Sequence, residues 1–233
     1  MTVYAFIFAR GGSKGLLRKN IKKLCNKPLI QYSIEVAMQV EEISRVFVST
    51  DDEEIAAVAQ NLGAEIISRP KELALDSTPE WLAWKHAIEW VHQHYGAFTD
   101  FVSLPATSPL RIKEDVIAAV NKRKTSSADL CIAITPASRS PFFNMVVVNP
   151  DESIELVNRP VSNIYRRQDV PVVFDITTIV YASTPDFIMG HCGLFDGKIV
   201  AIEVPKIRAI DIDDAYDFQM AEILMQGRIT NVD

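Results

Sequence analysis

Short apolar runs of strand length alternate with amphipathic helical patterns over the first 135 residues. The run Val3–Phe8 is apolar at every position, as expected for a strand that is covered on both faces. Further strands are predicted at 45–50, 64–68, 100–104 and 130–135, and helices at 28–37, 55–62, 79–95 and 114–122. This alternation predicts an α/β fold with a doubly wound, mostly parallel sheet.

Local signals support these assignments. Asp52 is well placed to cap the second helix, and Gly63 is a typical stop signal after it. The helix predicted at 79–95 carries its large apolar residues at helical spacing, which favours a core face over a ligand platform. These residues are Trp81, Trp84, Ile88, Val91 and Tyr95.

The pattern changes after residue 135. Prolines at 136, 141, 150, 160 and 171 separate short β-like runs at 145–148 and 154–157. Strand patterns then resume at 177–181 and 199–204, before a final helix at about 214–226. We therefore expect an α/β domain formed by residues 1–136 and 173–233. Residues 137–172 would form an inserted β-rich arm, which could cover an active site or reach a second subunit.

Composition and charge narrow the classes of function. The chain has 233 residues, of which 48% are hydrophobic and 23% charged, and a net charge of −6, so nucleic acid is an unexpected partner. A local cluster of basic residues can still bind a small anion. Three cysteines without a CxxC motif favour a reduced, cytoplasmic protein without zinc. The longest apolar run falls far short of the roughly 20 residues of a membrane span, so no membrane segment is expected.

Candidate chemistry begins in the loop directly after the first strand. Residues 10–20 read RGGSKGLLRKN, with three glycines among four cations. Such a loop can approach a phosphate closely through its backbone, and it matches neither the Walker A nor the GxGxxG pattern. The alternative is a glycine-rich hairpin whose charges, Lys19 included, are simply solvated.

Asp211 and Asp213 form a second candidate site. They lie at the end of a strand-like run, residues 206–212, and residues two apart in a strand face the same side. Two carboxylates together with substrate phosphates are a typical environment for Mg²⁺. Equally, the sequence DIDD before a helix could supply its N-terminal cap.

Several motifs together resemble the CMP-sialic acid synthetases, within the cytidylyltransferases that activate acidic sugars. The resemblance covers nearly the whole chain, and its most specific motif is the glycine-rich loop with Lys22 and the KPLI run that follows. The supporting motifs are VSTD ending at Asp51, Arg69 to Asp76, TSPLR at 107–111, RQDVP at 167–171, DID at 211–213, Asp217 with the phenylalanine after it, and Glu222.

The resemblance implies roles for individual residues. The nucleotide CTP would be bound by Arg10, Gly11, Gly12, Ser13, Lys19, Asn20 and Arg69. Arg10, Lys19 and Asp211 would be catalytic, and Asp211 and Asp213 would bind Mg²⁺. The carboxylated sugar would be bound by residues of the arm, namely Arg159, Arg166, Arg167, Gln168 and Asp169. For the arginines, a solvated arm or a subunit salt bridge is the alternative. The family also implies a homodimer whose arms are exchanged about a two-fold axis.

The sequence departs from the sialic acid pattern at two positions expected near the sugar. Pro105-Ala106 stands where Gln-Pro is usual, and Thr177-Thr178 where many members have Asn-Gly. We therefore expect CMP transfer from CTP to the anomeric hydroxyl of a 3-deoxy-2-ulosonic acid, with release of pyrophosphate. Sialic acid, a legionaminate-type sugar and an octulosonate all stay open as acceptors. A sugar-nucleotide-binding protein without activity is the competing class, and either Asp211 or a metal-bound water could act as the general base.

Overall fold

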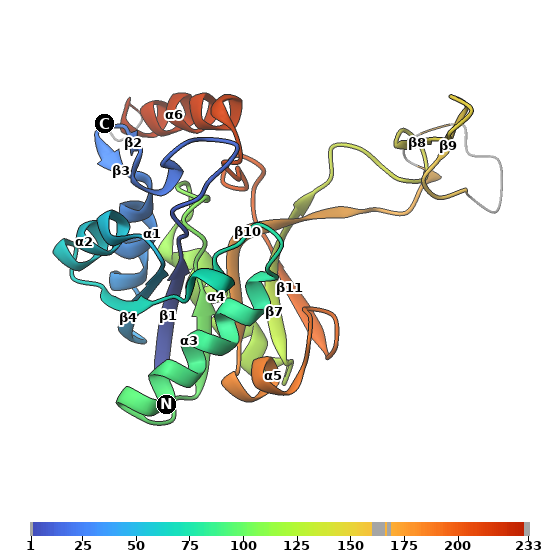
Figure 1. The fold of residues 1–233 in the computed structure, drawn as a ribbon. Coiled ribbons are helices and arrows are strands. Elements are labelled where there is room, and N and C mark those ends of the chain that lie inside the picture. The colour runs from blue at the N-terminus through green and yellow to red at the C-terminus, as the bar shows by residue number, and fades with distance from the viewer. Residues whose placement is uncertain (1, 160–165, 167–168, 231–233) are drawn as a thin grey trace.

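The computed structural model describes residues 2–159, 166 and 169–230 of the chain (Figure 1). Within them, one seven-stranded sheet has the order β11-β7-β10-β6-β1-β4-β5. Its strands are β1 (Val3–Phe8), β4 (Ile43–Thr50), β5 (Glu65–Ser68), β6 (Asp100–Ser103), β7 (Leu130–Pro136), β10 (Phe174–Ser183) and β11 (Ile199–Glu203). The helices are α1 (Leu29–Met38), α2 (Glu53–Asn61), α3 (Glu80–Tyr95), α4 (Lys113–Thr125), α5 (Pro185–Gly190) and α6 (Ala215–Thr230).

Helices cover both faces of the sheet, as a doubly wound fold requires. Alternate residues of β1 point to opposite faces, so Ala5 and Ile7 pack with α1, α2 and α4, whereas Phe6 packs with α3 and α5. The aromatic stripe of α3 belongs to the second core, where Trp84 and Ile88 are buried. The predicted doubly wound, mostly parallel sheet is confirmed, and the stripe is core as predicted except at Tyr95, which is exposed.

One central strand runs against the others. β10 pairs antiparallel with β6 and with β7, whereas the other ladders of the sheet are parallel. The chain leaves the sheet at Pro136 and returns beside it at Phe174, because these two residues are paired in the ladder. No crossover helix intervenes among the described residues between them, so the returning strand must run antiparallel.

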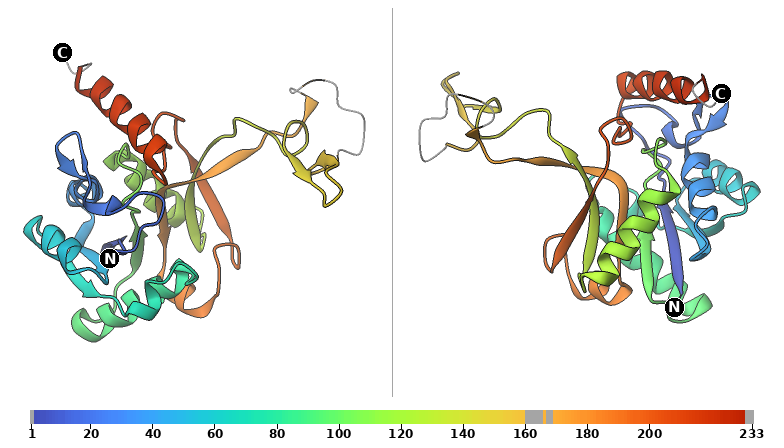
Figure 2. Two further views of the ribbon diagram at one scale, coloured as in Figure 1. Left: turned by 45° about the horizontal axis from the view of Figure 1, so that its top comes forward. Right: turned by 180° about the vertical axis from the view of Figure 1, so that it is seen from behind.

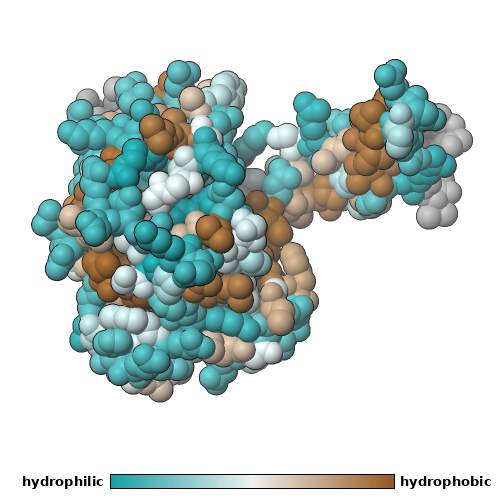
Figure 3. Space-filling model, viewed as in Figure 1, coloured by the Kyte–Doolittle hydropathy of each residue, from teal (hydrophilic) through white to brown (hydrophobic). Residues whose placement is uncertain are grey.

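The intervening segment projects away from the sheet (Figures 1 and 2). Its described part contains a small hairpin of β8 (Val146–Val148) and β9 (Ile154–Leu156), close to the two predicted β-like runs. Several of its apolar side chains are exposed, and they form a hydrophobic area on the arm in Figure 3. They include Phe143, Met145, Val146, Val147 and Val148.

A third core lies at the carboxyl edge of the sheet, beneath α6. Leu110 and Ile212 are fully buried there, against Phe218 of α6 and Leu24 of the short hairpin β2 (Lys23–Leu24) and β3 (Lys27–Pro28). The strand predicted at 206–212 is therefore wrong. Ile210 and Ile212 pack as loop residues under α6, Ile207 is exposed, and the strand before this segment ends at Glu203.

Helix ends follow the local signals. The Asp52 carboxylate accepts hydrogen bonds from the backbone N–H groups of Glu54 and Ile55, as predicted. Gly63 has a φ of +89°, a left-handed conformation that favours glycine. None of the described helices is both long and apolar enough to span a bilayer.

Candidate active site

A cavity of about 590 Å³ opens at the carboxyl edge of the sheet. Loops that follow β1, β5 and β6 build its walls, in agreement with the usual place of ligand sites in open α/β sheets. Seven of the predicted site residues line it: Arg10, Ser13, Lys19, Asn20, Arg69, Asp211 and Asp213. Gly11 and Gly12 belong to the same loop but are not among its lining residues.

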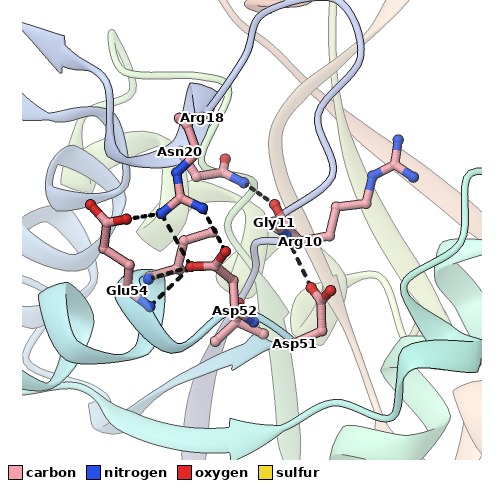
Figure 4. A network of polar contacts seen from close by, with 9 residues as sticks. Arg10, Gly11, Arg18, Asn20, Asp51, Asp52 and Glu54 are labelled. Carbon is pink, nitrogen blue, oxygen red and sulfur yellow. Dashed lines mark hydrogen bonds and ion pairs between the residues drawn. The ribbon is translucent and has the colours of Figure 1, made fainter.

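The glycine-rich loop is held in place from below by a polar network (Figure 4). The Gly11 N–H donates to the Asp51 carboxylate at 3.0 Å, and Arg18 donates to Asp52 at 2.7 Å and also to Glu54. A Cβ at Gly11 would lie 2.7 Å from the Asp52 carboxylate, so this glycine allows close packing of the loop. The Arg10 guanidinium points away from the network in Figure 4, and it lines the cavity.

Gly15 has a second packing role. A Cβ there would lie 2.2 Å from the backbone oxygen of Asp213, so only glycine lets the loop approach this segment. Lys19 strengthens the same contact, since its Nζ donates to the Ile212 carbonyl at 2.5 Å and lies 3.4 Å from the Asp213 carboxylate. With 12% of its side chain exposed, Lys19 is not the solvated charge that the sequence suggested as the alternative.

Two cations of the loop share one acidic partner. Arg10 and Lys14 both form ion pairs with Asp76, which also lines the cavity. The hydrogen bond from Lys14, followed by that from Arg10, holds the pKa of Asp76 below its ordinary value. The sequence motif contained Asp76, but only the fold reveals it as a partner of the loop cations, because the two segments are about sixty residues apart.

Arg69 lies deep in the cavity wall and is 7% exposed. It donates to the Ser49 carbonyl at 2.7 Å and to the Ser49 hydroxyl at 3.1 Å, and its guanidinium lies over the Phe8 ring. Burial lowers the pKa of Arg69, while the charges of Glu80 and Asp51 act in the opposite direction. Glu80, at the first position of α3, also lines the cavity. Sequence reasoning missed it because an acid at a helix N-terminus is common for electrostatic reasons alone.

The Asp211 carboxyl combines burial with an unsatisfied oxygen. Its Oδ1 is buried and has no hydrogen-bond partner among the described residues. Burial raises the pKa of Asp211, the charge of Asp213 adds to this, and the hydroxyls of Thr107 and Thr178 oppose it. An unpartnered carboxylate oxygen is costly in a folded protein unless a ligand uses it. The donor set therefore fits a divalent cation, with Asp213 beside it and phosphate oxygens completing the shell.

The helix cap is formed by different acids. The Asp214 carboxylate accepts from the N–H groups of Tyr216 and Asp217, and the Asp217 carboxylate accepts from those of Asp213 and Asp214. Capping of α6 therefore needs neither the Asp211 nor the Asp213 side chain, and the capping alternative does not account for them. The described residues contain no cluster of three or more metal-binding side chains.

The predicted sugar-binding residues of the arm are not brought to this cavity within one chain. Arg159 pairs with Glu155 at 2.5 Å, and Arg166 pairs with Asp169 at 3.0 Å. Arg167 and Gln168 lie outside the described residues. Among the arm residues that are described, none lines the cavity.

Comparisons with known proteins agree with this architecture. A family model described as cytidylyltransferase matches residues 4–229. An N-acylneuraminate cytidylyltransferase of Escherichia coli is 32% identical over 97% of this chain, which corresponds to 52% of that protein. A CMP-N,N'-diacetyllegionaminic acid synthase of Campylobacter jejuni is 31% identical over 94% of this chain and 93% of its own length.

The fold is also that of a solved structure. It matches a CMP:2-keto-3-deoxy-manno-octonic acid synthetase in complex with CTP, with a TM-score of 0.73 and 18% sequence identity. The match covers 98% of this chain and all of the other. The family model and the two relatives confirm the resemblance inferred from the sequence motifs.

Proposed function

Because this chain belongs to the cytidylyltransferase family, we propose that its cavity transfers CMP from CTP to the anomeric hydroxyl of a 3-deoxy-2-ulosonic acid. One observation carries the proposal. One cavity brings together the loop cations Arg10, Lys14 and Lys19 and the buried, unpartnered Oδ1 of Asp211. Cations and a divalent metal site are both needed where a triphosphate is cleaved.

At the α-phosphorus, the reaction makes one P–O bond and breaks another. The anomeric oxygen of the sugar attacks the α-phosphorus of CTP, the bond from that phosphorus to the bridging oxygen breaks, and pyrophosphate leaves with the bonding electrons. Negative charge accumulates on the pyrophosphate, where Arg10, Lys14 and Lys19 would stabilise it more strongly in the transition state than in the ground state. Arg10 and Lys14 would exchange their contacts with Asp76 for contacts with phosphate.

Asp211 and Asp213 are the residues that would hold Mg²⁺. When bound, the metal neutralises phosphate charge and orients the triphosphate. Asp211 supplies a buried oxygen, and Asp213 supplies an exposed one that Lys19 already contacts. Asp211 is also a candidate to accept the proton of the sugar hydroxyl, and Glu80 is a second acid of the cavity wall with a pKa raised by burial.

We place the sugar site between two copies of the chain, with residues 137–172 as the dimerisation arm. The arm stands away from its own sheet and exposes Phe143, Met145 and Val148, the last with 71% of its surface accessible. Soluble monomers tend to avoid such apolar patches, and arginines next to aromatic residues are typical of interfaces. Arg159 and Arg166 would then bind the carboxylate of the sugar in the partner's cavity, with Arg167, Gln168 and Asp169 beside them.

The cellular setting proposed here is the cytoplasm. The three cysteines are free thiols, and Cys131 is buried, which fits a reducing compartment.

A pyrophosphate-release assay tests the function and the acceptor together. The purified protein is incubated with CTP, Mg²⁺ and one acid at a time: N-acetylneuraminate, a legionaminate, a pseudaminate, 3-deoxy-octulosonate, or none. Release that depends on a nonulosonate supports the proposal, and release with octulosonate alone supports the alternative acceptor. Binding of CTP without release in any mixture would support the non-catalytic class and overturn the proposed activity.

A further inference from the structure

Arg111 is the last residue of the TSPLR motif, and the proposed reaction gives it no role. It is 3% exposed and does not line the cavity. Burial lowers the pKa of Arg111 to about 9, while the charges of Asp115 and Asp211 act against this shift. A buried guanidinium without a directly bonded carboxylate needs other strong acceptors, and the fold supplies them.

Four acceptors surround the guanidinium. It donates to the Ser33 hydroxyl at 2.9 Å, to the Pro105 carbonyl at 2.7 Å, to the Thr178 carbonyl at 3.2 Å and to the Ile179 carbonyl. These groups come from α1, from the loop after β6 and from β10. Arg111 therefore ties three separate elements together directly behind the cavity.

The contacts with β10 have a specific cause. In the ladder with β7, Thr177 pairs with Ala133, but the next partner, Ile132, pairs with Tyr181. Residues 178–180 thus form a bulge, and their carbonyl groups lose their ladder partners. Arg111 satisfies two of these carbonyls, so the bulge and the buried arginine explain each other.

The bulge and the loop after β6 both face the site. Thr178 and the residues Pro105, Ala106 and Thr107 line the cavity. The Ser108 and Thr178 hydroxyls share a hydrogen bond of 2.6 Å, and the Ile212 N–H donates to the Thr107 carbonyl at 2.9 Å. The loop, the bulge and the segment that carries Asp211 are therefore one connected unit.

We propose that Arg111 is a positioning residue for cytidylyl transfer, which fixes the Pro105–Thr107 loop and the Thr178 bulge against Asp211. The part of this proposal that concerns turnover rests on the proposed function. Arginine suits this position because its planar fork donates in several fixed directions at once, whereas a lysine ammonium has three donors on one atom. The chain's two departures from the sialic acid pattern, Pro105-Ala106 and Thr177-Thr178, lie in or beside this unit. The unit would therefore also set the shape of the wall that meets the sugar.

The test compares Arg111→Lys with Val120→Ala. Val120 is a buried residue of α4 that packs near Val3 and Ile43, away from the carboxyl edge, so its truncation destabilises the fold without touching the unit. We expect Arg111→Lys to lower kcat by roughly ten- to hundredfold, since small misplacements near a reaction centre have effects of this size. The KM for CTP should change less than about threefold, because the phosphate cations belong to another loop. Val120→Ala should leave kcat unchanged per folded molecule.

Hydrogen exchange gives a readout that does not depend on activity. In Arg111→Lys, the amides of residues 177–182 and of Ile212 should exchange about tenfold faster, while those of β4 and β5 stay as in the parent. Ser108→Ala keeps the guanidinium and should increase the exchange rates of the same amides by a smaller factor. This variant replaces Arg111→Lys in the test if Arg111→Lys does not fold.

The outcomes separate the two proposals. A lower kcat together with faster hydrogen exchange at residues 177–182 and Ile212 supports the positioning role. A folded Arg111→Lys with unchanged kcat and exchange overturns it, as does a loss of kcat that Val120→Ala reproduces at equal loss of thermal stability. If the parent protein turns over no sugar acid, the proposed function fails, and the exchange pattern alone then decides whether Arg111 holds the unit.

Discussion

The cavity edge of the sheet and the arm carry similar side chains in opposite settings. At the cavity, Arg69 is buried and bonded to backbone, and Lys19 is bonded to the Ile212 carbonyl. In the arm, Arg159 and Arg166 are 78% and 67% exposed, and within the described part of the chain their ion pairs are with acids three or four residues away. The first region is preorganised by its own fold. The arginines of the second region make only local, exposed ion pairs, which they could exchange for contacts with another copy of the chain in the proposed dimer.

The largest expected effect tests the preorganised region. Asp211→Ala should slow turnover by a hundredfold or more, on the order of 3 kcal/mol of transition-state stabilisation, because a buried carboxylate that would hold Mg²⁺ is lost. Thermal unfolding should change little, since the Asp211 side chain makes no cap contact. Steady-state kinetics and a thermal melt of the same preparation check this.

Asp214→Ala is the matched control for that variant. It removes the cap of α6, which costs about 1 kcal/mol of stability, and should leave kcat unchanged. If Asp214→Ala loses as much activity as Asp211→Ala, the site depends on the helix cap and not on the metal ligand.

Lys19→Ala is expected to come next. Removal of a cation from the triphosphate should lower kcat/KM for CTP by roughly tenfold to a hundredfold. Because Lys19 also bonds the Ile212 carbonyl, we expect a loss of about 1 kcal/mol in stability, in contrast to a solvated lysine. Lys23→Ala, an exposed lysine of β2, is the comparison and should change neither quantity. Unaltered kinetics of Lys19→Ala with CTP would contradict the proposal that the glycine-rich loop binds the triphosphate.

The comparison of the two regions is tested by mixing two impaired variants. Arg166→Ala damages the arm and Lys19→Ala damages the cavity. If the arm acts on the partner's cavity, a heterodimer contains one intact site, and about a quarter of the parental activity should return after full subunit exchange. Labelled subunits and native mass spectrometry establish the exchange. Exchange without recovered activity would mean that the arm serves its own cavity or that Arg166 does not bind substrate.

The smallest effect concerns Asp76, which competes with phosphate for Arg10 and Lys14. Asp76→Asn should tighten CTP binding by up to about fivefold, the scale of exposed ion pairs, as measured by calorimetry. The pKa of Asp76 lies below its ordinary value of 3.8. The carboxyl is therefore ionised at any pH well above 3.8 and loses its charge only at lower pH. The gain should therefore be constant from about pH 6 to 9. A gain that varies within this range would show that another group governs binding.

The sequence predicts much of the fold because the alternation of apolar patterns is strong in the first 135 residues. The direction of β10 was not accessible, because it depends on where the arm returns to the sheet. The pattern before Asp211 predicts a strand, but Ile210 and Ile212 pack under α6 as loop residues, and the packing of a loop has no fixed period.

The candidate site was predicted only in part, for a similar reason. Arg10, Lys19 and Asp211 stand in recognisable motifs, and the fold does bring them to one cavity. Asp76 and Glu80 come from distant segments, and only the tertiary structure shows that they line the same cavity as the loop cations. The sequence motif contains Arg111 but does not reveal its role. That role depends on the carbonyl groups of the bulge in β10, and the bulge is a feature of strand register.

The central claim, transfer of CMP to an acidic sugar, is tested most directly by following the phosphorus atoms. The protein, CTP, Mg²⁺ and the preferred ulosonic acid are monitored by ³¹P nuclear magnetic resonance. The account predicts that the three CTP signals are replaced by one phosphodiester signal and by pyrophosphate in equal molar amounts, with no change when the sugar or the protein is omitted. Appearance of CMP with pyrophosphate in the absence of sugar, or of CDP with inorganic phosphate, would contradict it.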